Sequence, residues 1–280
     1  MEARQGSYGA LLEPVLTQSL RDLVTTGEVI SLQHTIEPGI PVPSAHVPLT
    51  VAPYLRHGDP RSTFPSGGGF ASEITIMSQH TGTHVDALSH FHKRVGDVDY
   101  LYGPVAMADQ TDDLNLPCGA ERMPPIVGRG LLLDVPECLG LPLLPQSFEV
   151  TVDHLEACLA REGARLAKGD IVIFRTGYAK HWPDSDSFLR NQPGIGLLAA
   201  EYLASHGVVV VGSDTATVEV LPSPNLAVHE YLLVDVGIPM FECLNLEELS
   251  HRGHYVFVFV AAPLKIRGAT GSVVNPLAIL

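Results

Sequence analysis

Residues 80–92 read HTGTHVDALSHFH, so four of the thirteen histidines and one carboxylate fall within thirteen residues. An even spread of histidine would place fewer than one in a stretch of this length. Neutral imidazole and carboxylate groups are the usual protein ligands of zinc and similar divalent ions. The stretch therefore predicts a metal site.

Gly82 lies between the β-branched residues Thr81 and Thr83, which makes a continuous helix through this segment unfavourable. In an extended segment, His84 and Asp86 point to the same side because they are two residues apart. His80 can fold back across a turn at Gly82 and reach the same ion. His80, His84 and Asp86 thus form a candidate three-ligand set with an open position, an arrangement used for hydrolysis.

His90 follows Asp86 by four residues and would lie on the next turn if a helix began here. It could bind a second ion or act as a general acid/base. His92 would face elsewhere and is expected near the ligands or on the surface. Two plainer interpretations are weaker. Four unrelated polar histidines would not cluster around an aspartate, and structural zinc sites favour cysteine, which is absent from this stretch.

Composition narrows the class of protein. The chain has 280 residues, 45% of them hydrophobic, which is enough for a large core in one or two domains. A net charge of −14 argues against nucleic acid as a partner. No apolar run approaches a membrane span, and the first residues lack the pattern of a secretory signal. Four scattered cysteines favour free thiols in the cytoplasm.

The hydrophobic pattern predicts alternating strands and helices in a single mixed α/β domain. Leucine spacing in residues 1–27 predicts an N-terminal helical arm, leaving 28–280 as the main domain. Long loops are expected at 37–69, where they could cover a site, and at 96–125. A half-buried strand is expected at 73–79. Further strands are expected at 29–32, 130–135, 171–176, 208–212 and 255–261, and helices from Thr151 or Asp153 and at 197–206.

Residues 80–90 match H-x-G-T-H-x-D-x-x-x-H, the hallmark of a cyclase family that includes bacterial kynurenine formamidase, isatin hydrolase and some lactone hydrolases. The resemblance extends over roughly residues 28–280. Further blocks that look like the family are GLLLDV (130–135), KGDIVIFRTG (168–177), QPGI (192–195), VGSDT (211–215), VHEYLL (228–233), GIPMFE (237–242) and GATGS (268–272). The implied fold is related to the swivelling β/β/α class, and the implied assembly is a homodimer or larger homo-oligomer.

The resemblance also implies a complete ligand set. His229 and Glu242 would join His80, His84 and Asp86 in a centre of one or two ions, zinc or manganese, and His90 would be the general acid/base. The chain departs from many formamidases at Leu88, where they have proline, and in its N-terminal arm and its 96–125 insertion. These departures are expected near the substrate pocket, which weakens N-formylkynurenine as the substrate.

The leading function is therefore hydrolysis of a small amide, imide or lactone by metal-activated water. The alternatives are a metal-dependent cyclase or lyase and a metal-binding scaffold without activity. Candidates for the pocket wall, each equally compatible with the core, are Tyr54, Phe64, Phe70, Phe91, Tyr178 and Trp182. Candidates for contact with an acidic substrate, each more typical of a solvated surface, are Arg56, Lys93, Arg94 and Arg175. No phosphate-binding, nucleophile-elbow or HExxH motif supports other chemistry.

Overall fold

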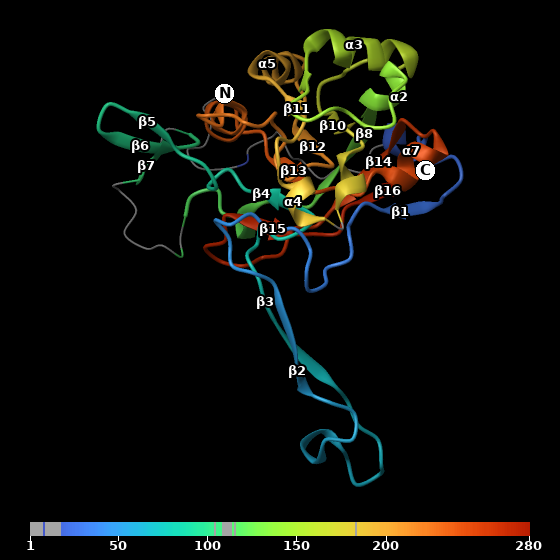
Figure 1. The fold of residues 1–280 in the computed structure, drawn as a ribbon, viewed down its shortest axis with the longest axis vertical. Coiled ribbons are helices and arrows are strands. Elements are labelled where there is room, and N and C mark those ends of the chain that lie inside the picture. Colours follow the sequence, from blue (N-terminus) through green and yellow to red (C-terminus); the bar gives the residue numbers. More distant parts are fainter. Residues whose placement is uncertain (1–7, 9–17, 104, 108–113, 115, 183) are drawn as a thin grey trace.

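A computed structural model describes residues 8 and 18–280 of the chain, apart from 104, 108–113, 115 and 183 (Figure 1). The described chain is organised around a nine-stranded sheet. Its strands, in order across the sheet, are β1 (Val29–Ser31), β16 (Leu277–Ile279), β14 (Val256–Ala261), β8 (Ile126–Asp134), β10 (Ile171–Arg175), β12 (Val210–Ser213), β13 (Met240–Glu242), β4 (His84–Asp86) and β15 (Gly271–Val273).

The centre of this sheet is parallel and its two sides are antiparallel. Strands β8, β10, β12 and β13 run in the same direction, and β14 and β4 are the antiparallel strands that flank them. Continuous apolar runs are expected where a parallel strand is buried on both faces. Leu131, Leu132 and Ile173 are indeed fully buried. The strands predicted at 130–135, 171–176, 208–212 and 255–261 are thus confirmed, and with them the mixed α/β fold.

Two helices, the amphipathic α3 and the more apolar α5, cover one face of the sheet, side by side (Figure 1). Helix α3 (Val152–Arg161) starts after Thr151, as predicted, and buries Leu155, Cys158 and Leu159. Helix α5 (Leu197–Ser205) matches the second prediction. The other helices are α2 (Val135–Leu139), α4 (Ser185–Phe188), α6 (Ala227–His229), which continues into a π-helical turn (Glu230–Asp235), and α7 (Glu247–Arg252). Among the described residues, no helix has the length and apolar character needed to cross a membrane.

The predicted loop at 37–69 and half-buried strand at 73–79 require correction. Strands β2 (Thr50–Leu55) and β3 (Ser72–Ile76) form a hairpin arm that projects from the body (Figure 1). The expected strand exists, but its residues 73–76 are exposed because the arm projects away from the core formed by the described residues. Alternation of side chains predicts a strand without saying what covers either face.

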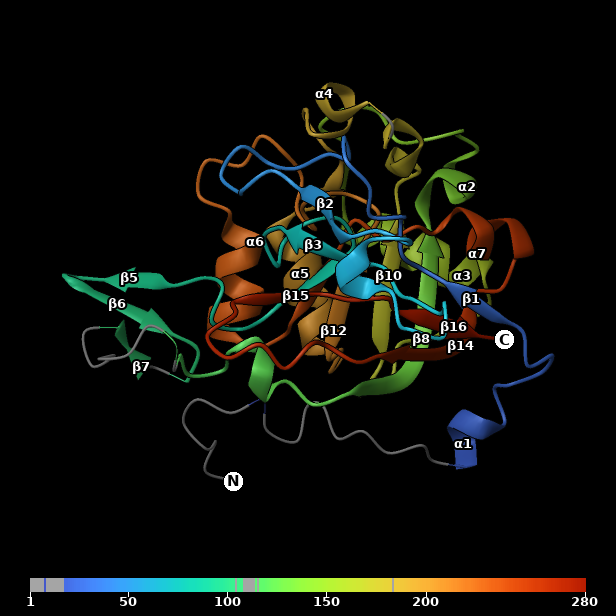
Figure 2. The same ribbon diagram turned by 90° about the horizontal axis from the view of Figure 1, so that it is seen from below.

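The expected irregular stretch at 96–125 is also partly structured. Strands β5 (Lys93–Val95), β6 (Val98–Leu101) and β7 (Val105–Ala106) form a small antiparallel sheet at the side of the body (Figure 2). Two very short strands, β9 (Glu149–Val150) and β11 (Gly194–Ile195), pair elsewhere. Short 3-10 turns occupy Pro60–Ser62, Ala120–Arg122 and Tyr178–His181.

The predicted N-terminal helical arm over residues 1–27 lies mostly outside the described residues. Between residues 18 and 27 the described helix is α1 (Gln18–Arg21), and the amides of Thr26 and Gly27 then bond to the carbonyl of Leu280. Tyr8 is buried in the core and donates a hydrogen bond to the carbonyl of Cys118. The domain boundary at residue 28 stays a prediction.

Glu162 follows α3 and is an acid in an unfavourable setting. One oxygen accepts a hydrogen bond from the amide of Asp134, and the other is buried with no partner among the described residues. Burial, together with the nearby charge of Asp134, raises the pKa of Glu162 from 4.5 to about 7. The folded protein therefore holds a proton that the unfolded chain has already released between these pH values.

A Glu162→Gln variant tests this consequence. Because the folded state binds more protons than the unfolded state, the wild-type free energy of unfolding should decrease as pH rises from 4.5 to about 7. The variant should lack this part of the decrease. Urea unfolding across that range measures it, with Glu156→Gln, on the exposed side of the same helix, as control. Parallel pH profiles for wild type and Glu162→Gln would contradict the assignment.

Candidate metal centre

The pairing of β13 with β4 brings together residues that lie about 160 positions apart. In the register of this pair, Glu242 lies opposite His84 and Met240 lies opposite Asp86. Residues directly opposite in an antiparallel pair present their side chains to the same face. His84 Nε2 accordingly lies 3.4 Å from Glu242 Oε2 and 3.3 Å from Asp86 Oδ1. The predicted extended path, with His84 and Asp86 on one side, is confirmed.

His80 reaches the same point by the predicted turn. Gly82 has a φ of +64°, a left-handed conformation that favours glycine. His80 Nδ1 lies 2.7 Å from Asp86 Oδ1, while its Nε2 lies 3.0 Å from Thr270 Oγ1. A Cβ atom on Gly271 would come within 2.5 Å of the His80 ring. Gly271, in the block GATGS, thus leaves room for the ring of His80, one of the predicted ligands.

His229 comes from helix α6, on a separate part of the chain. Its Nδ1 donates a hydrogen bond of 2.6 Å to Glu219 Oε2, and its Nε2 lies 3.4 Å from Glu242 Oε1. His84 is held in the same way, because its Nδ1 donates to the carbonyl of Gly82 at 2.8 Å. When Nδ1 carries the hydrogen, the Nε2 lone pair is free to bind an ion.

Two groups of possible ligands result, and Asp86 belongs to both. One consists of His80, His84 and Asp86, and the other of Asp86, His229 and Glu242, with ligand atoms within 4.8 Å of one another in each. All five side chains are buried. The five predicted ligands therefore meet at one place, although only the resemblance singled out His229 and Glu242.

The chemistry of this cluster fits a divalent ion. Asp86 Oδ2 is buried and has no hydrogen-bond partner among the described residues. An unpaired buried carboxylate oxygen is costly, and coordination to a cation satisfies it. Two buried carboxylates facing three imidazoles form a donor set suited to zinc or manganese.

The carboxylates also govern protonation of the histidines. Burial alone would lower the pKa of His84 and of His229. Hydrogen bonds and charges from Asp86 and Glu242, joined at His229 by Glu219, raise the pKa of each to about 10. Burial would likewise raise the pKa of Asp86, yet the charges of His90 and His80 hold it well below its usual value. The site therefore attracts positive charge, and protons compete with a metal ion for the same lone pairs.

His90 lies beside the cluster, but not on a helix. The segment after β4 makes a turn in which the amide of His90 bonds to the carbonyl of Ala87, so no helix begins here and His90 reaches the cluster from a turn. His90 Nε2 is 3.9 Å from Asp86 Oδ2, and its side chain is 27% exposed. The His92 side chain is 52% exposed and faces Asp99, as expected for a surface residue.

Leu88 does not mark the substrate pocket. It is fully buried in the main core, and its amide donates a hydrogen bond to the hydroxyl of Tyr8. The expectation that this departure lies at the pocket is wrong, because the turn at 87–90 points Leu88 into the core while His90 faces the cavity.

The cluster opens into a cavity of about 160 Å³. The described residues that line it are Pro41, Pro43, His46, His80, Gly82, His84, His90, Phe91, Ala216, Thr217, Leu226, His229, Glu242 and Cys243. The first part of the predicted covering loop does line the site. The sequence alone did not single out four other residues at the site, because nothing in their spacing connects them with residues 80–92. These residues are His46, Thr217, Glu219 and Thr270.

Of the six aromatic candidates for the pocket wall, Phe91 lines the cavity. Tyr54, Phe64 and Phe70 are exposed on the arm. Tyr178 is buried in a separate small cluster, and Trp182 stacks on His34 with ring centres 4.1 Å apart. The sequence named these six residues as candidates because they are aromatic, but it did not show that three of them lie on the β2–β3 arm.

The four cationic candidates are not among the described residues that line the cavity. Lys93 pairs with Asp235, and Arg94 pairs with Asp99. Arg175 lies between Asp134 and Glu247, where it ties β8 and β10 to α7. Arg56 is exposed on the arm.

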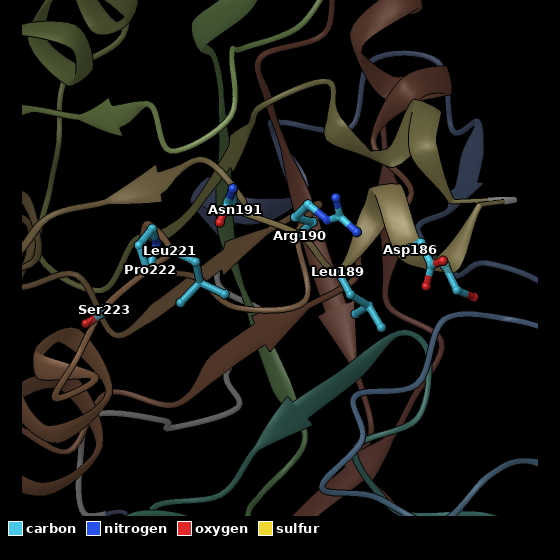
Figure 3. Close-up of a pocket in the computed structure, with 8 residues that line it drawn as sticks. Asp186, Leu189, Arg190, Asn191, Leu221, Pro222 and Ser223 are labelled. Carbon is cyan, nitrogen blue, oxygen red and sulfur yellow. The ribbon is translucent and has the colours of Figure 1, made fainter.

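A larger hollow of about 550 Å³ lies near α4 (Figure 3). Its ionisable lining residues are Asp186 and Arg190, and the described lining includes no histidine, cysteine or second carboxylate. Catalytic sites need converging groups, so the smaller cavity at the histidines is the better candidate.

Comparison with known proteins identifies the family to which the chain is similar. The family model described as "Putative cyclase" matches residues 30–220. Isatin hydrolase of Roseibium aggregatum is 27% identical over 271 residues, which are 90% of this chain and 92% of that protein. Kynurenine formamidase of Geobacillus thermodenitrificans is 30% identical over 213 residues, 75% of this chain and 80% of that protein. The crystal structure of a novel cyclase superposes with a TM-score of 0.89 at 29% identity, covering 100% of this chain and 95% of the other.

A Glu219→Gln variant tests how His229 is held. Loss of the carboxylate should weaken the hold on His229 Nδ1, so metal affinity should fall about 10- to 100-fold, as is usual for such partners of metal-binding histidines. Competition with a chromophoric chelator measures the affinity. Glu248→Gln, on the exposed side of α7, is the control. Unchanged affinity in Glu219→Gln would show that the hydrogen bond does not orient a ligand.

Proposed function

The chain belongs to the "Putative cyclase" family, and on that premise we propose that it is a metal-dependent hydrolase of a small amide, imide or lactone. The observation that carries the proposal is the meeting of three histidines and two carboxylates at a cavity beside His90. Relatives that act on isatin and on formylkynurenine, both of which have C–N bonds to hydrolyse, support this class of reaction.

The five ligands would be His80, His84, Asp86, His229 and Glu242. Asp86 belongs to both ligand groups, so it would help to hold the metal whether the centre takes one ion or two. When bound, zinc or manganese would lower the pKa of a water toward about 7 and polarise the substrate carbonyl. The hydrogen bonds from Nδ1 of His84 and His229 keep both rings in the orientation that binding requires.

His90 would be the group that moves a proton. Its Nε2 faces Asp86 Oδ2 across 3.9 Å, and its ring packs against that of His80 with centres 4.0 Å apart. No hydrogen bond occupies either ring nitrogen among the described residues, so His90 can accept a proton from water and return it to the leaving nitrogen or oxygen. The small cavity, with Phe91 as its aromatic wall, suits a compact cyclic or aryl substrate.

The decisive comparison is His90→Ala against His92→Ala. Loss of the proton carrier should reduce kcat by about 10²- to 10⁴-fold, while metal content stays unchanged because the five ligands remain. Replacement of the exposed His92 should leave both unchanged. Assays with isatin, formanilide and unsaturated lactones measure kcat, and elemental analysis of each preparation measures the metal content. Full activity in His90→Ala would remove its proposed role.

Labelled water distinguishes hydrolysis from the alternative cyclase or lyase reaction. A hydrolase should incorporate one oxygen from ¹⁸O-water into the product, because water is the nucleophile. Mass spectrometry of the product measures the incorporation. Product that forms without the label would favour the cyclase or lyase.

We also propose a homodimer or larger assembly in the cytoplasm. Tyr54, Phe64 and Ile76 are each more than half exposed on the arm, and a two-stranded hairpin is marginally stable by itself in water. A second copy that covers the arm would supply the missing contacts. The four cysteines are free, as expected in a reducing compartment. Light scattering should give a mass of at least two chains, and a monomer would contradict the assembly.

A further inference from the structure

His46 reaches the cavity from the loop that precedes the arm. Its ring stacks on that of His80, with centres 5.2 Å apart and planes inclined by 15°. It lines the same cavity as His84 and His90. His46 is not one of the five proposed ligands, because its ring belongs to neither ligand group. His46 is therefore a histidine at the candidate site to which neither metal binding nor proton transfer has been assigned.

Ser78 fixes which nitrogen of His46 carries the hydrogen. The Ser78 hydroxyl oxygen accepts a hydrogen bond of 3.2 Å from the amide of His80, and it lies 3.3 Å from His46 Nδ1. A serine has one proton to donate, and His46 Nδ1 is the acceptor within reach among the described residues. We assign the Ser78 hydroxyl hydrogen to His46 Nδ1, the arrangement in which that hydrogen has an acceptor, and this places the hydrogen of the neutral ring on Nε2.

The contact between Ser78 and His46 joins the two chain segments that flank the β2–β3 arm. His46 lies shortly before β2, and Ser78 lies between β3 and His80. The hydrogen bonds therefore form a continuous path from the backbone of His80, through Ser78, to the ring of His46. Such a path holds the ring at a defined angle to the candidate metal centre, which is a requirement for a group that recognises substrate.

The Nε2 hydrogen of His46 has no acceptor among the described residues. A fixed donor at the edge of a mostly buried site is suited to an oxygen that gains negative charge during reaction. On the proposed function, that oxygen is the carbonyl oxygen of the amide, imide or lactone. We propose that His46 donates a hydrogen bond from Nε2 to the substrate carbonyl oxygen, and that Ser78 is the residue that positions it. No proton changes place in this interaction, which leaves proton transfer to His90.

The test compares His46→Phe, His46→Gln and Ser78→Ala. Phenylalanine keeps an aromatic ring against His80 but removes the donor, whereas glutamine restores a donor. His251→Phe, at an exposed position on α7, is the matched control. Each variant is loaded with metal and assayed with isatin and formanilide for kcat, KM and metal content. Binding of the same two compounds is measured by calorimetry.

We expect His46→Phe to lose about 10²-fold in kcat/KM, mostly in kcat, because a donor to developing charge acts most strongly in the transition state. Metal content should equal that of wild type. His46→Gln should recover part of the loss, and Ser78→Ala should lie between wild type and His46→Phe. A merely structural role would instead reduce metal content or stability and would not be rescued by glutamine.

The outcomes separate this inference from the proposed function. If wild type hydrolyses a probe and His46→Phe does so equally well, His46 has no such role and the hydrolase proposal stands. If wild type binds a probe without hydrolysing it, and His46→Phe loses that binding, the hydrolase proposal fails while the donor role stands. If wild type neither binds nor hydrolyses either probe, and also hydrolyses none of the unsaturated lactones, both proposals are overturned.

Discussion

The antiparallel pairing of β4 with β13 places His84 opposite Glu242 and brings Asp86 beside them, inside the protein rather than on its surface. Burying two carboxylates together costs several kcal/mol per ion unless opposite charge compensates them. Here three imidazoles, and in the proposed function a divalent cation, provide that compensation. The other features of the site follow from it: a glycine turn that returns His80, a glycine that leaves room for its ring, and an α-helix that delivers His229.

Residues that bind no metal orient those that would. The carbonyl of Gly82 and the carboxylate of Glu219 each accept a hydrogen bond from Nδ1 of a candidate ligand, so both rings turn Nε2 toward the carboxylates. Thr270 contacts the ring of His80 in a related way. These contacts come from the turn before β4, the β12–α6 connection and the residue before β15, so the site depends on the closed fold. Ser78 extends the same principle to His46, at the edge of the cavity.

The prediction from sequence was most successful where pattern and chemistry are local. Apolar runs located the central strands, and the capped amphipathic pattern located α3. Spacing alone placed His84 and Asp86 on one side of an extended segment and returned His80 across Gly82. It failed at 50–76, because alternating apolar residues predict a strand but not whether it joins the body or an arm. The expectation that Leu88 lies near the pocket, which came from its departure from the family's proline, also failed, because the turn after Asp86 buries Leu88 in the core.

By itself, the sequence determined that residues 80–92 carry a metal-binding pattern, since the ligand types and their spacing are contained in thirteen residues. Through its resemblance to a family it also pointed to His229 and Glu242. Only the tertiary structure decided that these five side chains meet, that Glu219 and Thr270 hold them, and that His46 faces the cavity. The physical reason is that strand register and long-range packing set these distances, and neither can be read from the order of residues along a single chain.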